Sequence, residues 1–175
     1  MNGVGMLLGF TNYPGFARAF TRLMDNEGGY SAGQDDPGGE TKFGISKRSY
    51  PTIDIAALTR EDARAIYLRD FWLRGRMEAF DPAIGFQIFD IAVNSGIETA
   101  IRMLQRAAGV VDDGHIGPIT LAAVTAKPRA TMLMLILAER LDFWRKLSNW
   151  PVSGKGWAGR AAADLRYAAI DDAPA

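Results

Sequence analysis

Apolar side chains recur at helical spacing along most of this 175-residue chain. Near its front, Phe16, Phe20, Leu23, Met24 and Glu27 fall at i, i+4, i+7, i+8 and i+11, which is one face of an amphipathic helix. The glycine pair at positions 28 and 29 is a typical helix stop. This pattern predicts a first helix that ends close to Glu27.

Similar periodicity predicts helices along the rest of the chain. Thr59 to Asp62 resembles a capping box, and apolar residues follow it at helical spacing. Asp81 and Pro82 form a good N-cap and first-turn pair before residues 84–93, which are apolar nearly all round and therefore predict a buried central helix. We also expect a short helix over 51–58 and further helices over 97–108, from 117, over 128–147 and over 154–169.

Residues 28–46 differ from this pattern, because Gly, Pro, Asp and Ser dominate there. Such a composition favours loops and a short hairpin, and this is the only plausible β region of the sequence. The predicted fold class is mainly α, with a small β-hairpin or loop insertion after the first helix.

Composition narrows the functional classes. The chain is 48% hydrophobic and 23% charged, as in ordinary globular proteins, and its formal net charge is zero, which gives no argument for nucleic acid or anionic membranes as partners. The sequence contains no run of ~20 apolar residues, so it predicts no membrane span. With no cysteine and a single histidine, His115, disulfides and thiolate metal sites are excluded and a zinc site is disfavoured. We expect no metal or organic cofactor.

Two carboxylates near the front suggest glycosidase chemistry. Glu27 combines the apolar face of its helix with the last turn, where both burial and the helix dipole disfavour the charged form. Asp36 lies in a polar, glycine-rich turn, where a carboxylate stays ionised. A protonated acid beside an ionised carboxylate is the pair that glycoside cleavage needs, and Thr41 follows with a hydroxyl for water or sugar.

From these residues alone, the alternatives stay open. Glu27 also fits a carboxylate that frays into solvent at a helix end, and Asp36 fits a turn residue before Pro37. Asp90 fits a buried residue held by an arginine better than a catalytic one. Trp144, Trp150 and Trp157 fit either sugar stacking or the core, with at least two expected in the core.

The front motif resembles a known family. Glu27-Gly-Gly-Tyr30, Asp36-Pro-Gly-Gly39 with Thr41, and Gly44-Ile-Ser46 are similar to the signature of glycoside hydrolase family 108, a group of lysozyme-like muramidases found among phage endolysins and secretion-associated wall hydrolases. The order of carboxylate, aspartate and threonine is also similar to that of phage-type lysozymes. The resemblance implies a lysozyme-like fold, peptidoglycan as substrate, Glu27 as catalytic acid, and auxiliary roles for Asp36 and Thr41.

The resemblance continues to about residue 165. Phe89 to Gly96 looks like the central helix of the family, with Asn94 near the cleft. The segment from Leu104 through Ile116-Gly-Pro118 to Val124 is similar to helical peptidoglycan-binding modules. The resemblance implies a tail over residues 1–14, a catalytic core over 15–108 and a C-terminal helical region over 109–175 packed on it. The substrate contacts it suggests are Tyr30, Gly39, Phe43, Ser46, Asn94 and Gln105.

The resulting hypothesis is an N-acetylmuramidase that cuts peptidoglycan, acts as a monomer and is encoded by a phage as an endolysin. Because no clear export signal is visible, we expect synthesis in the bacterial cytoplasm and action on the wall. A catalytically silent peptidoglycan-binding module and a protein that assists secretion through the wall are the alternatives.

Overall fold

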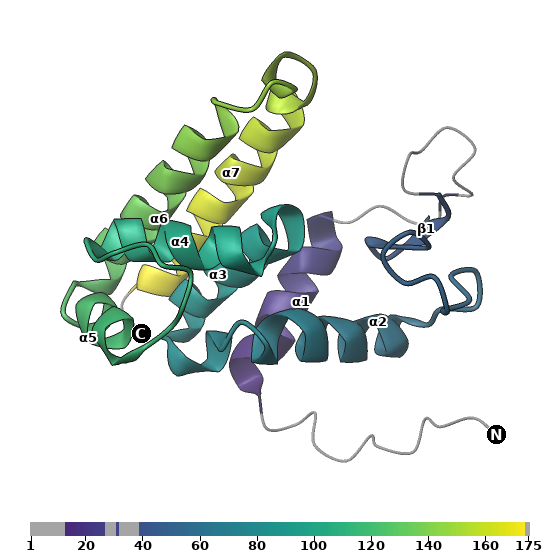
Figure 1. Cartoon of the computed structure of the whole chain (residues 1–175), viewed down its shortest axis with the longest axis horizontal. Helices are drawn as coiled ribbons and strands as arrows, with labels where there is room; N and C mark the ends of the chain where they lie inside the picture. The colour runs from purple at the N-terminus through teal and green to yellow at the C-terminus, as the bar shows by residue number, and fades with distance from the viewer. Residues whose placement is uncertain (1–12, 27–30, 32–38, 174–175) are drawn as a thin grey trace.

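The computed structural model describes residues 13–26, 31 and 39–173. Within them the chain is mainly helical, with one small antiparallel hairpin formed by β1 (Thr41–Lys42) and β2 (Ile45–Ser46). The helices gather around one central helix, while a pair of long C-terminal helices extends to one side (Figure 1). The predicted fold class is confirmed.

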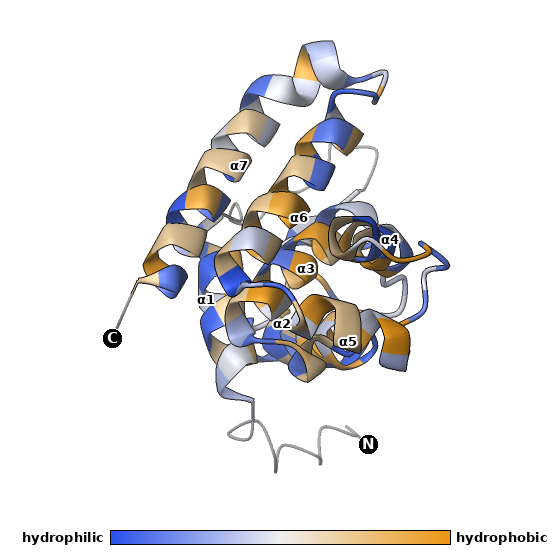
Figure 2. Cartoon of the chain, turned by 90° about the vertical axis from the view of Figure 1, so that its left-hand side faces the viewer, coloured by the Kyte–Doolittle hydropathy of each residue, from blue (hydrophilic) through white to orange (hydrophobic). Residues whose placement is uncertain are grey.

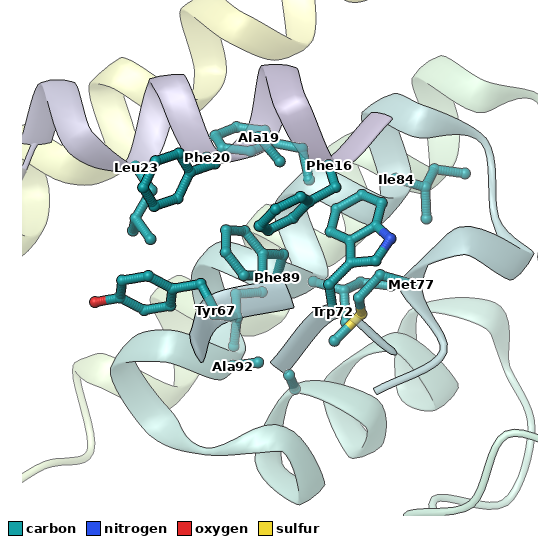
Figure 3. Packing of buried hydrophobic residues seen from close by; sticks show 14 of the residues in the cluster. Phe16, Ala19, Phe20, Leu23, Tyr67, Trp72, Met77, Ile84, Phe89 and Ala92 are labelled. Carbon is teal, nitrogen blue, oxygen red and sulfur yellow. The ribbon is translucent and has the colours of Figure 1, made fainter. Parts of the chain in front are cut away.

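Helix α1 (Pro14–Asn26) has the apolar face that its sequence predicts. Phe16, Ala19, Phe20 and Leu23 are buried on that face. Phe16 lies 5.6 Å from the Trp72 ring, centroid to centroid, and their neighbours fill the space between α1 and the helices below it (Figure 3). Burial of such large side chains contributes about 1.5–3 kcal/mol each, so this face anchors α1 firmly.

Helix α2 (Arg60–Tyr67) begins at the predicted capping box. The Thr59 hydroxyl accepts from the Asp62 backbone N–H, and the Asp62 carboxylate accepts from the Thr59 backbone N–H. The helix then continues directly into a π-helical turn, η2 (Leu68–Leu73), and a short 3₁₀ segment follows, η3 (Met77–Ala79). π-helical turns are rare and often occur at functional sites.

The prediction of a short helix over residues 51–58 is wrong, because this segment forms successive turns. Ile53 and Leu58 donate their backbone N–H groups three residues back, and the Asp54 carboxylate accepts from the Ala57 N–H. Two lysine ammonium groups, from Lys47 and Lys42, donate to the carbonyls of Ile53 and Ala56. In a helix the Ala57 N–H would bond to the Ile53 carbonyl, but here side chains of Asp54 and Lys47 bond to these two groups instead.

Helix α3 (Pro82–Ser95) is the centre of the molecule, as predicted. Its N-cap is Asp81, whose carboxylate accepts from the Ala83 N–H, and ten consecutive residues from Ala83 to Ala92 are buried. It contacts α1, α4 (Ile97–Ala108), α6 (Arg129–Trp144) and α7 (Trp150–Asp172). Every layer of the fold is therefore built on α3.

A buried ion cluster joins α3 to the C-terminal helices. Asp90 of α3 is fully buried and accepts two hydrogen bonds from the Arg160 guanidinium, at 2.9 and 2.6 Å. Arg140, also buried, lies 2.7 Å from an Asp90 oxygen and donates to Asp164 at 2.5 Å. The expectation that arginine holds Asp90 as a buried residue is confirmed.

The two carboxyl groups of this cluster differ in charge balance. Burial would raise the pKa of Asp90, but the Arg140 and Arg160 charges outweigh it and hold that pKa below its usual value. Asp164 has less compensation, because one of its carboxylate oxygens has no hydrogen-bond partner. Burial and the nearby Asp90 charge raise the pKa of Asp164 to about 7. Asp164 is therefore the group that takes a proton first.

The C-terminal region contains α5 (Pro118–Thr125), α6 and α7. Helices α6 and α7 lie side by side over most of their length (Figures 1 and 2). Compared with the predicted bounds, α6 ends three residues earlier and α7 is longer at both ends. The Arg22 guanidinium of α1 donates to Asp171 at 2.7 and 2.8 Å, so α7 is also tied to the first helix.

The tryptophans of α6 and α7 form one small cluster. Trp144 is buried and stacks on Trp157 at 5.7 Å, and Trp150 lies 6.0 Å from Trp157. Trp150 and Trp157 are half-buried. Because the three rings pack against one another, we assign them to the contact between α6 and α7.

None of the described helices is by itself long and apolar enough to cross a membrane. The bent pair of α5 and α6, whose axes differ by 116°, meets the length and composition of a span only when taken together.

Gly85 permits the close packing between α3 and the η2–η3 segment. A Cβ at this position would lie 2.8 Å from the Met77 carbonyl oxygen and 3.3 Å from the Trp72 ring. We predict that Gly85→Ala lowers the free energy of unfolding by about 1–3 kcal/mol, because backbone must move to relieve the overlap. Gly156→Ala in α7 is the matched control: nothing lies within 4 Å of its added Cβ, so urea unfolding should show unchanged or higher stability. Equal effects of the two substitutions would contradict this packing.

The buried cluster predicts a pH dependence of stability. Because the pKa of Asp164 rises from 3.8 to about 7 on folding, the folded state holds more protons than the unfolded state between these values. Stability from this group is present below about pH 4 and is lost as the pH rises through 7, with a slope of up to about 1.4 kcal/mol per pH unit. Asp164→Asn should make the unfolding free energy, measured from pH 5 to pH 7.5, distinctly less pH-dependent than in the wild type. Parallel curves would contradict the assignment.

Candidate functional site

A groove of about 640 Å³ lies between the hairpin and the helices. One wall comes from the hairpin and the turn after it, a second from the end of α2 and from η2, and the third from the junction of α3 with α4. The residues that line it are Gly44, Ile45, Ser49, Tyr50, Tyr67, Asp70, Phe71, Arg74, Val93, Gly96, Ile97, Glu98 and Thr99. Tyr67 is buried, whereas the rings of Tyr50 and Phe71 are partly exposed and suit the faces of sugars.

The hairpin wall depends on a tight two-residue turn. Phe43 and Gly44 connect β1 to β2 and have φ of 53° and 75°, the positive values that a type I′ turn requires. Positive φ is unusual for a phenylalanine. The Tyr67 hydroxyl donates to the Phe43 carbonyl at 3.0 Å, which fixes the turn against α2.

Thr41 and Gly39, two of the predicted site residues, lie at the base of this hairpin. The Thr41 hydroxyl donates to the Gly39 carbonyl at 3.1 Å, and Gly39 has φ of 71°. The Thr41 backbone exchanges two hydrogen bonds with Ser31, at 2.9 and 3.0 Å. This bridge holds Ser31 beside the base of the hairpin.

Three predicted substrate contacts border the groove without lining it. Phe43 precedes Gly44, and its half-buried ring packs against the core. Ser46 donates its hydroxyl hydrogen to Ser49, a lining residue, at 3.1 Å. Asn94 is exposed between Val93 and Gly96, and its amide donates to the Asp90 carbonyl.

Gln105 has a different role from the predicted one. Its side chain is 1% exposed, its amide nitrogen donates to Asp113 and the His115 carbonyl, and its amide oxygen accepts from the Gly114 N–H. These bonds hold the turn between α4 and α5. We therefore correct the expectation of a sugar contact at Gln105: its buried amide bonds to a loop of the protein itself.

Glu27, Tyr30 and Asp36 lie outside the described residues. Helix α1 ends at Asn26, so Glu27 is the next residue of the chain. Leu23 of α1 lies on the side of the core toward which the Tyr67 hydroxyl points (Figure 3). Tyr67 lines the groove, and its ring lies 6.0 Å from Phe20 of α1.

A hydrogen-bonded cluster in the groove was missed by the sequence analysis. The Tyr50 hydroxyl donates to Asp70 at 2.9 Å, and Arg69 donates to both oxygens of the same carboxylate at 2.6 Å. Burial and the Asp70 bond raise the pKa of Tyr50 to about 12. The Arg69 hydrogen bond, together with Tyr50, lowers the pKa of Asp70, which therefore stays ionised. Sequence spacing carried no signal for this pair, which is 20 residues apart.

Within the described part of the chain, no group of three or more His, Asp or Glu side chains is arranged to hold a metal ion. His115 is exposed in the turn before α5, as its sequence context suggested.

Comparisons with known proteins agree with this geometry. Residues 20–96 match the family model described as "Glycosyl hydrolase 108", and residues 99–161 match one described as "Predicted Peptidoglycan domain". The structure titled "Structure of Brucella abortus SagA" superposes with a TM-score of 0.80 at 30% identity, over 90% of this chain and 96% of that one. No curated protein sequence gives a significant match.

The fold and groove define a lysozyme-like hydrolase that acts on peptidoglycan. The chain belongs to glycosyl hydrolase family 108 and is a glycoside hydrolase. The two family models divide the chain between residues 96 and 99, where α3 gives way to α4. The division at 108 and 109 suggested by the sequence stays a prediction.

The Tyr67 bond to the hairpin turn gives a direct test of the groove wall. Tyr67→Phe removes one buried hydrogen bond and frees a strained turn, so we predict a loss of about 1 kcal/mol in unfolding free energy and a several-fold drop in peptidoglycan hydrolysis. Tyr167→Phe is the control, because that ring packs edge-on against Phe86 in α3, away from the hairpin. The account of the wall would be contradicted if both variants hydrolysed peptidoglycan at the wild-type rate.

Proposed function

We propose that this protein is an N-acetylmuramidase that hydrolyses the β-1,4 bond between N-acetylmuramic acid and N-acetylglucosamine, with Glu27 as its catalytic acid. The observation that carries the proposal is the placement of α1, which packs through Phe20 on the groove residue Tyr67 and ends one residue before Glu27.

Helix geometry supports the role of Glu27. Position 27 comes four residues after Leu23 and seven after Phe20, which is the sequence spacing of the buried face of α1. A carboxyl group beside apolar side chains and at the negative end of a helix favours its protonated form. A protonated acid is what the leaving glycosidic oxygen requires.

Asp36 and Thr41 complete the proposed chemistry. Asp36 would remain ionised and either stabilise positive charge on the sugar ring or orient the attacking water. Thr41 assists from the base of the hairpin, where its hydroxyl already donates to Gly39 and its oxygen remains able to accept. Tyr30, Gly39, Phe43, Ser46 and Asn94 are the proposed substrate contacts.

We further propose that the protein works as a monomer, is made in the bacterial cytoplasm and reaches the wall as a phage endolysin. This part rests on the kind of protein that the front motif resembles, and co-expression with a holin in a bacterial host would test it through timed lysis.

The acid assignment predicts a specific loss. Glu27→Gln keeps the size of the side chain but removes the transferable proton, so dye release from labelled peptidoglycan should fall at least 1,000-fold, since proton transfer and positioning act together. The unfolding free energy should stay within about 1 kcal/mol of the wild type. Glu78→Gln is the matched control on an exposed turn and should retain full activity.

The main alternative is a silent binding module that uses the same groove. If wild type and Glu27→Gln both sediment with insoluble peptidoglycan and neither releases dye, the binding module is the correct function. If Glu27→Gln releases dye as fast as the wild type, another group supplies the proton and the role of Glu27 is wrong.

A further inference from the structure

The groove contains three charged side chains, Asp70, Arg74 and Glu98. The two acids already have partners outside the groove lining. Arg69 covers both oxygens of Asp70, and Arg102 donates to Glu98 at 3.0 and 2.9 Å. Each acid is thereby neutralised by its own arginine.

Arg74 differs from both acids. It is exposed in the groove, and no carboxylate among the described residues pairs with it. Its positive charge contributes to the lowered pKa of the nearby Asp70 and partly offsets the rise in the pKa of Tyr50. Counted together with Arg69 and Arg102, which pair the two acids, these charged side chains sum to one positive charge, and Arg74 is the cation that has no carboxylate partner among the described residues.

The backbone around Arg74 is firmly held. Arg74 caps η2, and its own N–H and that of Gly75 both bond to the Phe71 carbonyl. Gly75 is buried, and a Cβ there would lie only 2.8 Å from the same carbonyl oxygen. Arg74 therefore lines the groove from a firmly held turn, as a specificity contact needs.

A guanidinium binds a carboxylate through two parallel hydrogen bonds, which adds geometric selectivity to charge. Resting on the proposed function, we propose that Arg74 binds a carboxylate of the peptidoglycan substrate and thereby selects muramyl glycans over neutral chitin-type glycans. Peptidoglycan offers such carboxylates in two places, on the peptide stem and, once the stem is removed, on the lactyl ether of muramic acid.

The test measures kcat and KM on three substrates of matched length: peptide-bearing glycan, glycan stripped of peptides by an amidase, and chitin oligosaccharides. For Arg74→Gln we expect KM to rise about tenfold on a carboxylate-bearing substrate, kcat to change less than twofold, and chitin hydrolysis to keep its wild-type KM. Arg74→Lys should raise KM less than Arg74→Gln does, since lysine restores the positive charge but not the two parallel hydrogen bonds of a guanidinium. Arg166→Gln, on the exposed side of α7, is the matched control.

The two glycans distinguish the source of the carboxylate. A loss confined to peptide-bearing glycan assigns Arg74 to the stem, and a loss on stripped glycan assigns it to the lactyl group. An equal loss on chitin, or no loss on either glycan, would overturn the proposal.

Failure of the muramidase assignment gives a different result. If the wild type cleaves none of the three, sedimentation with insoluble peptidoglycan and with insoluble chitin still decides the role of Arg74. Weaker binding of Arg74→Gln to peptidoglycan alone supports carboxylate recognition, whereas equal binding of both proteins to peptidoglycan rejects it.

Discussion

Asp90 places a carboxylate in the middle of an otherwise apolar, buried helix, and the rest of the fold is arranged to compensate for it. An unpaired charge at such a position would cost several kcal/mol, so the arginines of α6 and α7 must dock against α3. The same contacts fix the α3–α4 junction, because α4 packs between α3 and α6. A third wall of the groove thus depends on a salt bridge that the substrate never contacts.

The groove itself combines rigid and strained parts. Gly85 lets η2 approach α3 closely, the π-helical turn brings Asp70, Phe71 and Arg74 to one wall, and Tyr67 holds the positive-φ hairpin turn opposite. Tyr67, Asp70, Phe71 and Arg74 lie close together in sequence, whereas the hairpin turn and Gly85 come from other segments, so the fold brings the walls together. Together they give a glycosidase of this family a walled channel with aromatic faces and, at Arg74, a cation that has no carboxylate partner among the described residues.

Local signals in the sequence predicted most of the fold. The capping box at Thr59, the Asp81–Pro82 start of α3 and the apolar face of α1 depend on neighbours within two turns, and the structure confirms all three. The segment 51–58 forms turns held by contacts with Lys42 and Lys47 from outside it, and Gln105 was misassigned because its partners lie in the next loop. The Tyr50–Asp70 pair depends on a tertiary contact that no local pattern reveals, whereas Arg74 follows Tyr67, Asp70 and Phe71 at the i, i+3, i+4, i+7 spacing of one helix face, a signal that was not used.

The central claim is that the bond cut is the muramidase bond. Mass spectrometry of the soluble fragments from purified peptidoglycan, with borohydride reduction before analysis, identifies the sugar at each new reducing end. Our account predicts reduced N-acetylmuramic acid at the new ends of disaccharide peptides. Reduced N-acetylglucosamine, 1,6-anhydromuramic acid or the absence of released fragments would contradict it.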